Sequence, residues 1–137
     1  MKKKYEIAIG GAIAAAILLG STPAFAEGSW SSYLSKVGVG FSSRSWVDNA
    51  SDQVATTVKL SGCSLNTTGT FSSATINLYR EYGIFADLSV GSIVNYCNTT
   101  NWGQALQGDS YHFTIERING SSSTAPRMSA TSVVTTY

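Results

Sequence analysis

The stretch Gln53-Val-Ala-Thr-Thr-Val-Lys-Leu60 decides the fold class, because residues suited to a core recur in it at every second position. In an extended strand these residues share one face, and they are Val54, Thr56, Val58 and Leu60. Ala55, Thr57 and Lys59 would lie on the opposite face. One face buried and one face solvated is typical of a strand in an antiparallel sheet.

Six other segments have the β-branched and aromatic composition of strands, and they are 37–47, 75–79, 84–90, 93–97, 111–116 and 128–137. Turn-forming residues separate them, at 48–52, 61–62 and 68–69, with a longer loop at 98–109 and a hairpin connection at 119–126. The part of the chain after residue 26 has no helical periodicity of convincing length. About seven short strands predict an all-β fold, a single small antiparallel β-sandwich in preference to a small barrel.

The first 26 residues have the three parts of a secretory signal peptide. Lys2–Lys4 form a positive start, Ile7–Leu19 is an apolar run, and Ala24 and Ala26 are the small residues of a cleavage site. Because the apolar run is shorter than the roughly 20 residues of a membrane span, we expect cleavage and no stable membrane anchor. The mature chain would begin at Glu27, and 27–137 would form one secreted domain, with a leader of bacterial type.

The composition excludes two classes of protein. The chain has 137 residues, of which 43% are hydrophobic and 12% charged, with 9 Lys and Arg against 8 Asp and Glu. This balance is unlike that of a disordered chain or of a basic nucleic-acid-binding protein. Three lysines and one glutamate lie in the predicted leader, so the mature domain would have a net charge of −1.

The chain has two cysteines, Cys63 and Cys97, and one histidine, His112. Export would place both thiols in an oxidising compartment, so the sequence predicts a Cys63–Cys97 disulfide. One histidine is too few for a typical zinc site, and the oxygen donors at 48–52 lack the spacing of a calcium loop. We therefore expect no metal and no cofactor, and a turn held by Asx side chains at 48–52.

Catalytic sets are sparse in this sequence. A Ser-His-Asp or Cys-His arrangement would have to use His112, the one histidine. Glu81, His112 and Arg117 supply the residue types in which the chain resembles small secreted guanyl-specific ribonucleases, but here the Arg follows the His, and residue types alone are a weak basis for assigning activity. No G-x-S-x-G motif is present, and nothing in the spacing of the carboxylates predicts the pair of a glycosidase. The sequence favours a protein that is not an enzyme.

The loop predicted at 98–109 carries the residues most suited to binding, because it combines one tryptophan with amides and a carboxylate. An aromatic ring can stack on a sugar while amides and carboxylates bond its hydroxyls, and loops on a rigid sandwich often bind ligands. The candidate binding residues are Asn98, Asn101, Trp102, Gln104 and Asp109. The alternative is that Trp102 packs inward and caps the core beside the disulfide.

These observations leave three functions open. The first is a secreted, non-catalytic binding module for a glycan or another extracellular surface. The second is a small secreted toxin, antimicrobial protein or inhibitor, and the third, least favoured, is a hydrolase. Asn49, Asn66, Asn98 and Asn119 each begin an N-x-[ST] sequence, which would be a glycosylation site only in a eukaryotic secretory pathway.

Overall fold

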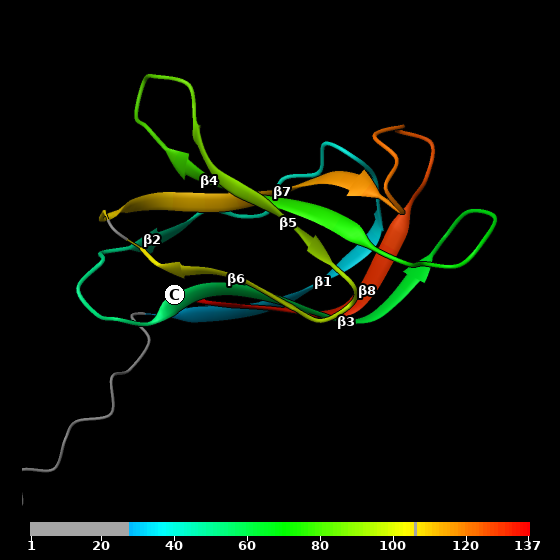
Figure 1. Ribbon diagram of the computed structural model, residues 1–137, viewed down its shortest axis with the longest axis horizontal. Helices are drawn as coiled ribbons and strands as arrows, with labels where there is room; N and C mark the ends of the chain where they lie inside the picture. The colour runs from blue at the N-terminus through cyan, green and yellow to red at the C-terminus, as the bar shows by residue number, and fades with distance from the viewer. Residues whose placement is uncertain (1–27, 106) are drawn as a thin grey trace, which may run out of the picture.

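A computed structural model describes residues 28–105 and 107–137, and these residues form a β-sandwich of two antiparallel sheets. The first sheet has the strand order β1-β8-β3-β6 and the second the order β2-β7-β4-β5, and the two lie as layers one above the other (Figure 1). The strands are β1 (Ser29–Val37), β2 (Trp46–Asp48), β3 (Ala55–Leu65), β4 (Ala74–Glu81), β5 (Leu88–Asn95), β6 (Thr99–Gln104), β7 (Asp109–Ile118) and β8 (Met128–Thr136). The predicted all-β sandwich is confirmed, with eight strands in place of about seven and no helix in the described residues. The predicted leader and the start at Glu27 lie outside those residues.

The core lies between the two sheets, and both inner faces contribute to it. In β3 the expected alternation is confirmed, because Thr56, Val58 and Leu60 are buried while Lys59 is exposed. Val54 precedes the strand. The largest side chains with almost no exposure come from both layers, and they include Leu60, Ile76, Leu78, Phe113, Ile115, Ile118 and Met128. Burial of these apolar surfaces between the layers is the main stabilisation that the fold has.

Residues 37–47 do not form the single strand that the sequence predicts. β1 ends at Val37, β2 begins at Trp46, and the segment between them runs along the edge of β7. Main-chain bonds fix it there, from Gly40 N to the Ile115 carbonyl and from Ser43 N to the Phe113 carbonyl, each 2.8 Å. Gly40 has a φ of 92°, a left-handed conformation that interrupts regular extension.

An aromatic cluster closes the core beside β2. The ring of Trp30 lies 5.9 Å from that of Trp46 and 6.2 Å from that of Phe113, and Trp46 lies 5.7 Å from Tyr137. The turn after β2 is confirmed, because carboxylate oxygens of Asp48 and Asp52 accept the Ala50 and Val54 N–H groups at 2.9 and 2.8 Å. The cluster joins residues scattered along the chain, whereas the turn is built from one short segment.

The predicted strand at 84–90 is wrong in its first half. Residues 82–87 form the loop of the β4–β5 hairpin, and β5 begins only at Leu88. Phe85 N donates to the Tyr82 carbonyl at 3.0 Å, which closes a turn, and Gly83 within it has a φ of 61°. The alternation of apolar residues here therefore does not report a buried face, and Ile84 is 96% exposed.

Two further connections differ from the predicted ones. Within the predicted loop 98–109, residues Thr99–Gln104 form β6, because the edge of β3 offers main-chain partners to this threonine-rich segment. The connection at 119–126 is not a hairpin, since β7 and β8 belong to different sheets. Asn119, at a φ of 50°, begins this crossing, and its side-chain oxygen accepts the N–H groups of Ser72 and Ser73.

The predicted disulfide is confirmed, with the Cα atoms of Cys63 and Cys97 5.9 Å apart. It joins β3 in the first sheet to the turn between β5 and β6, where the chain passes from the second sheet to the first. Asn98 helps to fix the same turn, because its carbonyl accepts Leu60 N–H at 2.9 Å and its side chain accepts Tyr96 N–H at 3.1 Å. The bond therefore constrains the point at which the two layers are connected.

Candidate functional site

A bulge in β7 places two charged side chains side by side on the outer face of the second sheet. Ile115 pairs with Ile76 and Arg117 pairs with Thr75, so Glu116 has no partner on β4. The extra residue keeps Ile115 and Ile118 buried while Glu116 and Arg117 both point outward. Strict alternation from Ile115 would have turned Arg117 toward the core.

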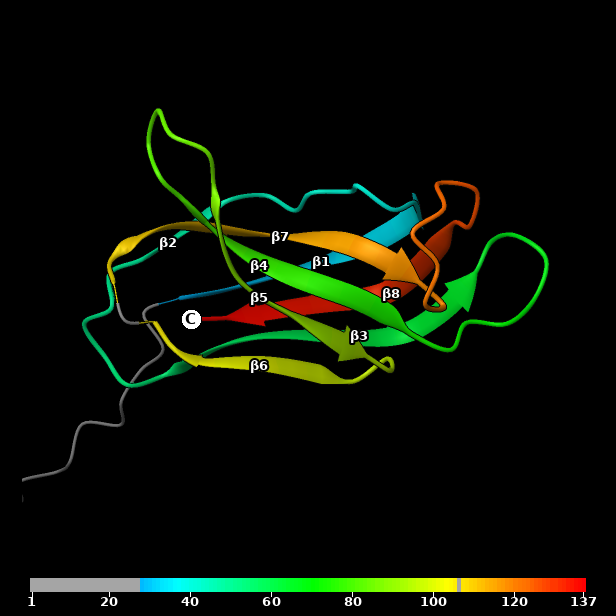
Figure 2. The same ribbon diagram turned by 45° about the horizontal axis from the view of Figure 1, so that its top comes forward.

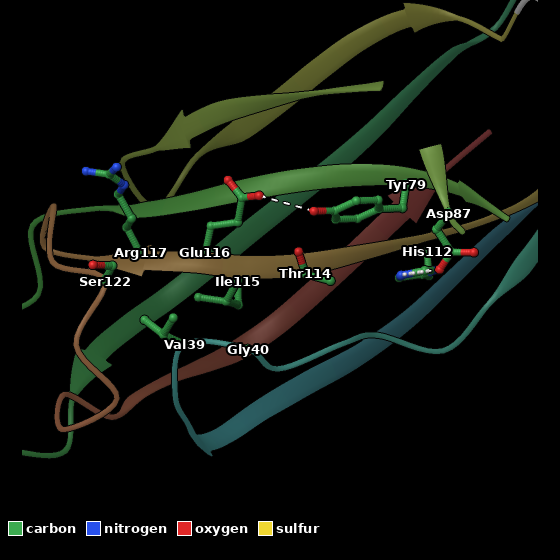
Figure 3. Close-up of a pocket in the computed structure, with 10 residues that line it drawn as sticks. All are labelled: Val39, Gly40, Tyr79, Asp87, His112, Thr114, Ile115, Glu116, Arg117 and Ser122. Carbon is green, nitrogen blue, oxygen red and sulfur yellow. Dashed lines mark hydrogen bonds and ion pairs between the residues drawn. The ribbon is translucent and has the colours of Figure 1, made fainter. Parts of the chain in front are cut away.

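These side chains line an open groove of about 600 Å³ that runs over β7 (Figure 3). Val39 and Gly40, from the segment along the β7 edge, form one wall, and Ser122 lies at the end next to Arg117. His112 and Asp87 lie at the other end, with Tyr79 and Glu116 between. We call this the β7 groove; its lining residues are Val39, Gly40, Tyr79, Asp87, His112, Thr114, Ile115, Glu116, Arg117 and Ser122.

Glu116 is held by donors on β4 and β5. Its Oε1 accepts from the Asn77 amide at 2.6 Å and from the Tyr79 hydroxyl at 3.4 Å, and its Oε2 accepts from Ser92 Oγ at 2.6 Å. Partial burial acts to raise the pKa of Glu116, but these bonds and the nearby charge of Arg117 outweigh it, and the net pKa is lowered. The groove therefore contains a fixed, ionised carboxylate at neutral pH.

Tyr79 joins the two ends of the groove. Burial and the charge of Glu116 raise the pKa of the Tyr79 hydroxyl, so that it remains a neutral donor to that carboxylate. Its ring stacks on the imidazole of His112, with centroids 5.5 Å apart and planes 15° from parallel. Asn77 extends the same network, because its carbonyl oxygen accepts from Ser89 Oγ at 2.8 Å.

At the other end of the groove, His112 lies between two carboxylates. Its Nδ1 is 3.0 Å from Glu81 Oε1 and its Nε2 is 3.8 Å from Asp87 Oδ2. Ser45 Oγ donates to the same oxygen of Glu81. Because carboxylates face both ring nitrogens, the imidazole is placed to hold the hairpin loop against β7. A catalytic triad requires a ring nitrogen that faces a serine nucleophile, and neither nitrogen of His112 does so.

The residues predicted to bind a ligand do not gather at this groove. Asn98 belongs to the turn beside the disulfide, and Asn101 Oδ1 accepts Gly103 N–H at 2.7 Å. Gln104 Nε2 donates to the Asp52 carbonyl at 2.9 Å. Each of the three amides thus bonds a main-chain group, and a role for them in binding stays a prediction.

A second, smaller cavity has a volume of about 290 Å³, and its lining includes Trp102, Gln104, Leu78 and Arg80. Asp109 lies beside it through its bond to Arg80. Trp102 packs against the core, as the inward alternative expects, and its Nε1 donates to the Gly91 carbonyl at 2.8 Å. Asp109 accepts from Arg80 Nε at 2.9 Å, and this bond, with the Ser110 N–H, lowers the pKa of Asp109.

Sequence reasoning considered several members of the β7 groove singly, but not as a site. His112, Thr114 and Glu116 share a face by simple alternation, which was the available signal. Tyr79 and Asp87 could not be added, because strand pairing and the hairpin loop bring them there. The bulge that turns Arg117 outward has no recognisable sequence pattern.

Among residues 28–105 and 107–137, no group of three or more His, Cys, Asp or Glu side chains is placed to hold a metal ion. The described chain also contains no helix of the length and apolarity that a membrane span needs. Comparison with protein-family models, with curated proteins and with solved structures finds no match.

Proposed function

We propose that the protein is a secreted, non-catalytic recognition module that binds a glycan in the β7 groove. The observation that supports this most is Glu116, an ionised carboxylate fixed by three donors in a groove open to solvent. A fixed acceptor of this kind can receive hydroxyl hydrogen bonds without first losing side-chain freedom.

The other lining residues complement a ring that carries many hydroxyls. Arg117 supplies several N–H donors beside Glu116, and Thr114 and Ser122 supply hydroxyls that both donate and accept. A volume of about 600 Å³ lies within the range of small-molecule sites. Neutral, hydroxyl-rich ligands fit this mixture better than polyanions, because Glu116 and Asp87 would repel the latter.

We propose no catalytic activity because the titratable side chains of the groove are already engaged by neighbouring side chains. His112 is engaged by Glu81 and Asp87, and Glu116 is engaged by Asn77, Tyr79 and Ser92. Glu116 also has a lowered pKa, whereas a general acid for glycoside cleavage needs a raised one. Secretion is supported by the disulfide, which persists in oxidising compartments, and by the leader that the sequence predicts.

A glycan array with three forms of the protein tests the proposal. We expect the wild type to bind, Glu116→Gln to bind about tenfold or more weakly because a charged acceptor is lost, and Trp102→Ala to bind as the wild type does. Retained binding in Glu116→Gln with loss in Trp102→Ala would move the site to the smaller cavity. Cleavage of a bound glycan that disappears in His112→Ala would show an enzyme.

A further inference from the structure

The β4–β5 hairpin stands out from the body of the sandwich (Figures 1 and 2). The loop at its end is apolar in sequence. Ile84 is 96% exposed and Phe85 is 67% exposed, and Tyr82 and Leu88 are also exposed. No charged residue occurs in the five residues 82–86, which read Tyr-Gly-Ile-Phe-Ala. We call residues 82–86 the hairpin tip. Large exposed apolar side chains that occur together, unlike isolated ones, mark an interaction surface.

One pair of main-chain groups in the hairpin tip is already hydrogen-bonded, and its two aromatic rings lie together. Phe85 N–H and the Tyr82 carbonyl bond to each other at 3.0 Å, so these two polar groups need no water. The rings of Tyr82 and Phe85 lie 5.7 Å apart, and the Arg80 guanidinium lies 5.1 Å from the centre of the Tyr82 ring. Aromatic side chains are enriched at membrane interfaces, and the charge of Arg80 is already paired with Asp109 at 2.9 Å.

The shape and charge of the hairpin tip favour a neutral lipid surface over a partner protein or an anionic lipid surface. A projecting loop would need a partner protein with a matching hollow, whereas a fluid bilayer deforms around it. Because the tip is uncharged and Glu81 and Asp87 lie at its base, anionic lipid would not attract it. We infer that the hairpin tip docks the protein on a neutral lipid bilayer, with Ile84 and Phe85 inserted below the headgroups.

The strength of this contact follows from the few side chains involved. Interfacial segments insert about 5–10 Å, which accommodates a loop tip while the sandwich stays outside. Two large apolar side chains give weak and reversible attachment, weaker than that of a single myristoyl chain, because they bury fewer carbon atoms. Neither Ile84 nor Phe85 lines the β7 groove, although Asp87 at the base of the tip does.

Quenching of tryptophan fluorescence by lipids tests the contact directly. Ile84→Trp places a reporter on the hairpin tip, and Tyr33→Trp places a matched reporter on an exposed aromatic position of β1 in the first sheet. With phosphatidylcholine vesicles brominated on their acyl chains, at millimolar lipid, we expect the Ile84→Trp reporter to be quenched. The Tyr33→Trp protein should be quenched no more than the wild type, which shares the three native tryptophans.

Adding Phe85→Asp to Ile84→Trp should weaken the apparent partition about tenfold or more, because a carboxylate opposes insertion. Equal quenching at positions 84 and 33, or none at 84, would overturn the inference even if another part of the chain attaches to the vesicles. Quenching at position 84 that required phosphatidylglycerol would also overturn it, since the proposed surface is neutral. Glycan binding by the β7 groove is measured without lipid, so the two proposals fail separately.

Discussion

The outer faces of the two sheets differ, although the inner faces of both bury apolar side chains in the same core. On the first sheet the outward side chains are mostly neutral hydroxyls, and a hollow of about 370 Å³ there is lined by Tyr33, Ser64 and Thr131 among others. On the second sheet, Glu116, Tyr79 and His112 are tied to one another and to their neighbours. The shared core thus requires apolar inward residues in both sheets, while the outward residues of each sheet are free to serve a different function.

The two sheets also depend on different kinds of stabilisation. The first sheet contains Cys63 of the disulfide and a left-handed glycine, Gly62, that lies against the side chain of Thr131. The second sheet instead has hydrogen bonds among outward side chains, centred on Asn77 and Glu116. This difference predicts that covalent and backbone changes matter most in the first sheet and polar side-chain changes in the second.

The largest effect is expected from opening the disulfide. The Cys63→Ser, Cys97→Ser variant frees a loop of sequence separation 34. Its free energy of unfolding should fall by about 4 kcal/mol, since the unfolded chain regains loop entropy. Urea unfolding of the variant and the wild type measures this, and an unchanged midpoint would show that strand pairing alone fixes the crossing between the sheets.

A smaller but still large effect is expected for Gly62→Ala. A Cβ at this position would collide with Thr131, and the φ of 60° disfavours any L side chain, so a loss of about 3 kcal/mol is expected. Gly83→Ala is the matched control, because Gly83 has a φ of 61° but open space around it, and we expect a loss of about 1 kcal/mol. Equal melting temperatures for the two variants would show that a collision with Thr131 does not contribute to the loss of stability.

In the second sheet, Asn77→Ala should lower the free energy of unfolding by about 2 kcal/mol, because its partners Glu116 and Ser89 lose their bonds. Asn77 is only 5% exposed although it points away from the core. Lys59→Ala, on the outer face of the first sheet, should change stability by less than about 0.5 kcal/mol. Chemical unfolding of both variants compares the faces, and similar losses would contradict the proposed difference.

The smallest effect concerns acid stability. Because the pKa of Glu116 is lowered by folding, its carboxylate stabilises the protein above the ordinary glutamate pKa of about 4.3. This contribution is lost as the pH falls through the lowered pKa of the folded state. Glu116→Gln should therefore show a shallower loss of stability between neutral and acidic pH in urea titrations. The same pH dependence in both proteins would assign the acid sensitivity to other carboxylates.

Prediction from sequence worked where one face of a strand is buried. Thr56, Val58 and Leu60, and likewise Tyr111, Phe113 and Ile115, lie inside as their alternation indicates. It did not work at 84–87, where Ile84 and Ala86 alternate but lie in a loop. A period of two reports extension and composition, and it cannot report whether a second layer covers the face.

The predicted binding set shows the same limit. Asn98, Asn101 and Gln104 are close in sequence, and each bonds main-chain groups, so their role in binding stays a prediction. The β7 groove instead joins residues from β4, the hairpin loop, β7 and the segment along its edge. Proximity in sequence alone could not have predicted this groove.

By itself the sequence determined the all-β class, the disulfide and most inward-facing residues, because these follow from local periodicity and from the presence of only two cysteines. The tertiary structure decided that β7 and β8 lie in different sheets, that a bulge turns Arg117 outward, and that Ile84 and Phe85 project into solvent. These features depend on which strands pair and in which register, and pairing is a competition among distant segments that no single stretch of chain contains.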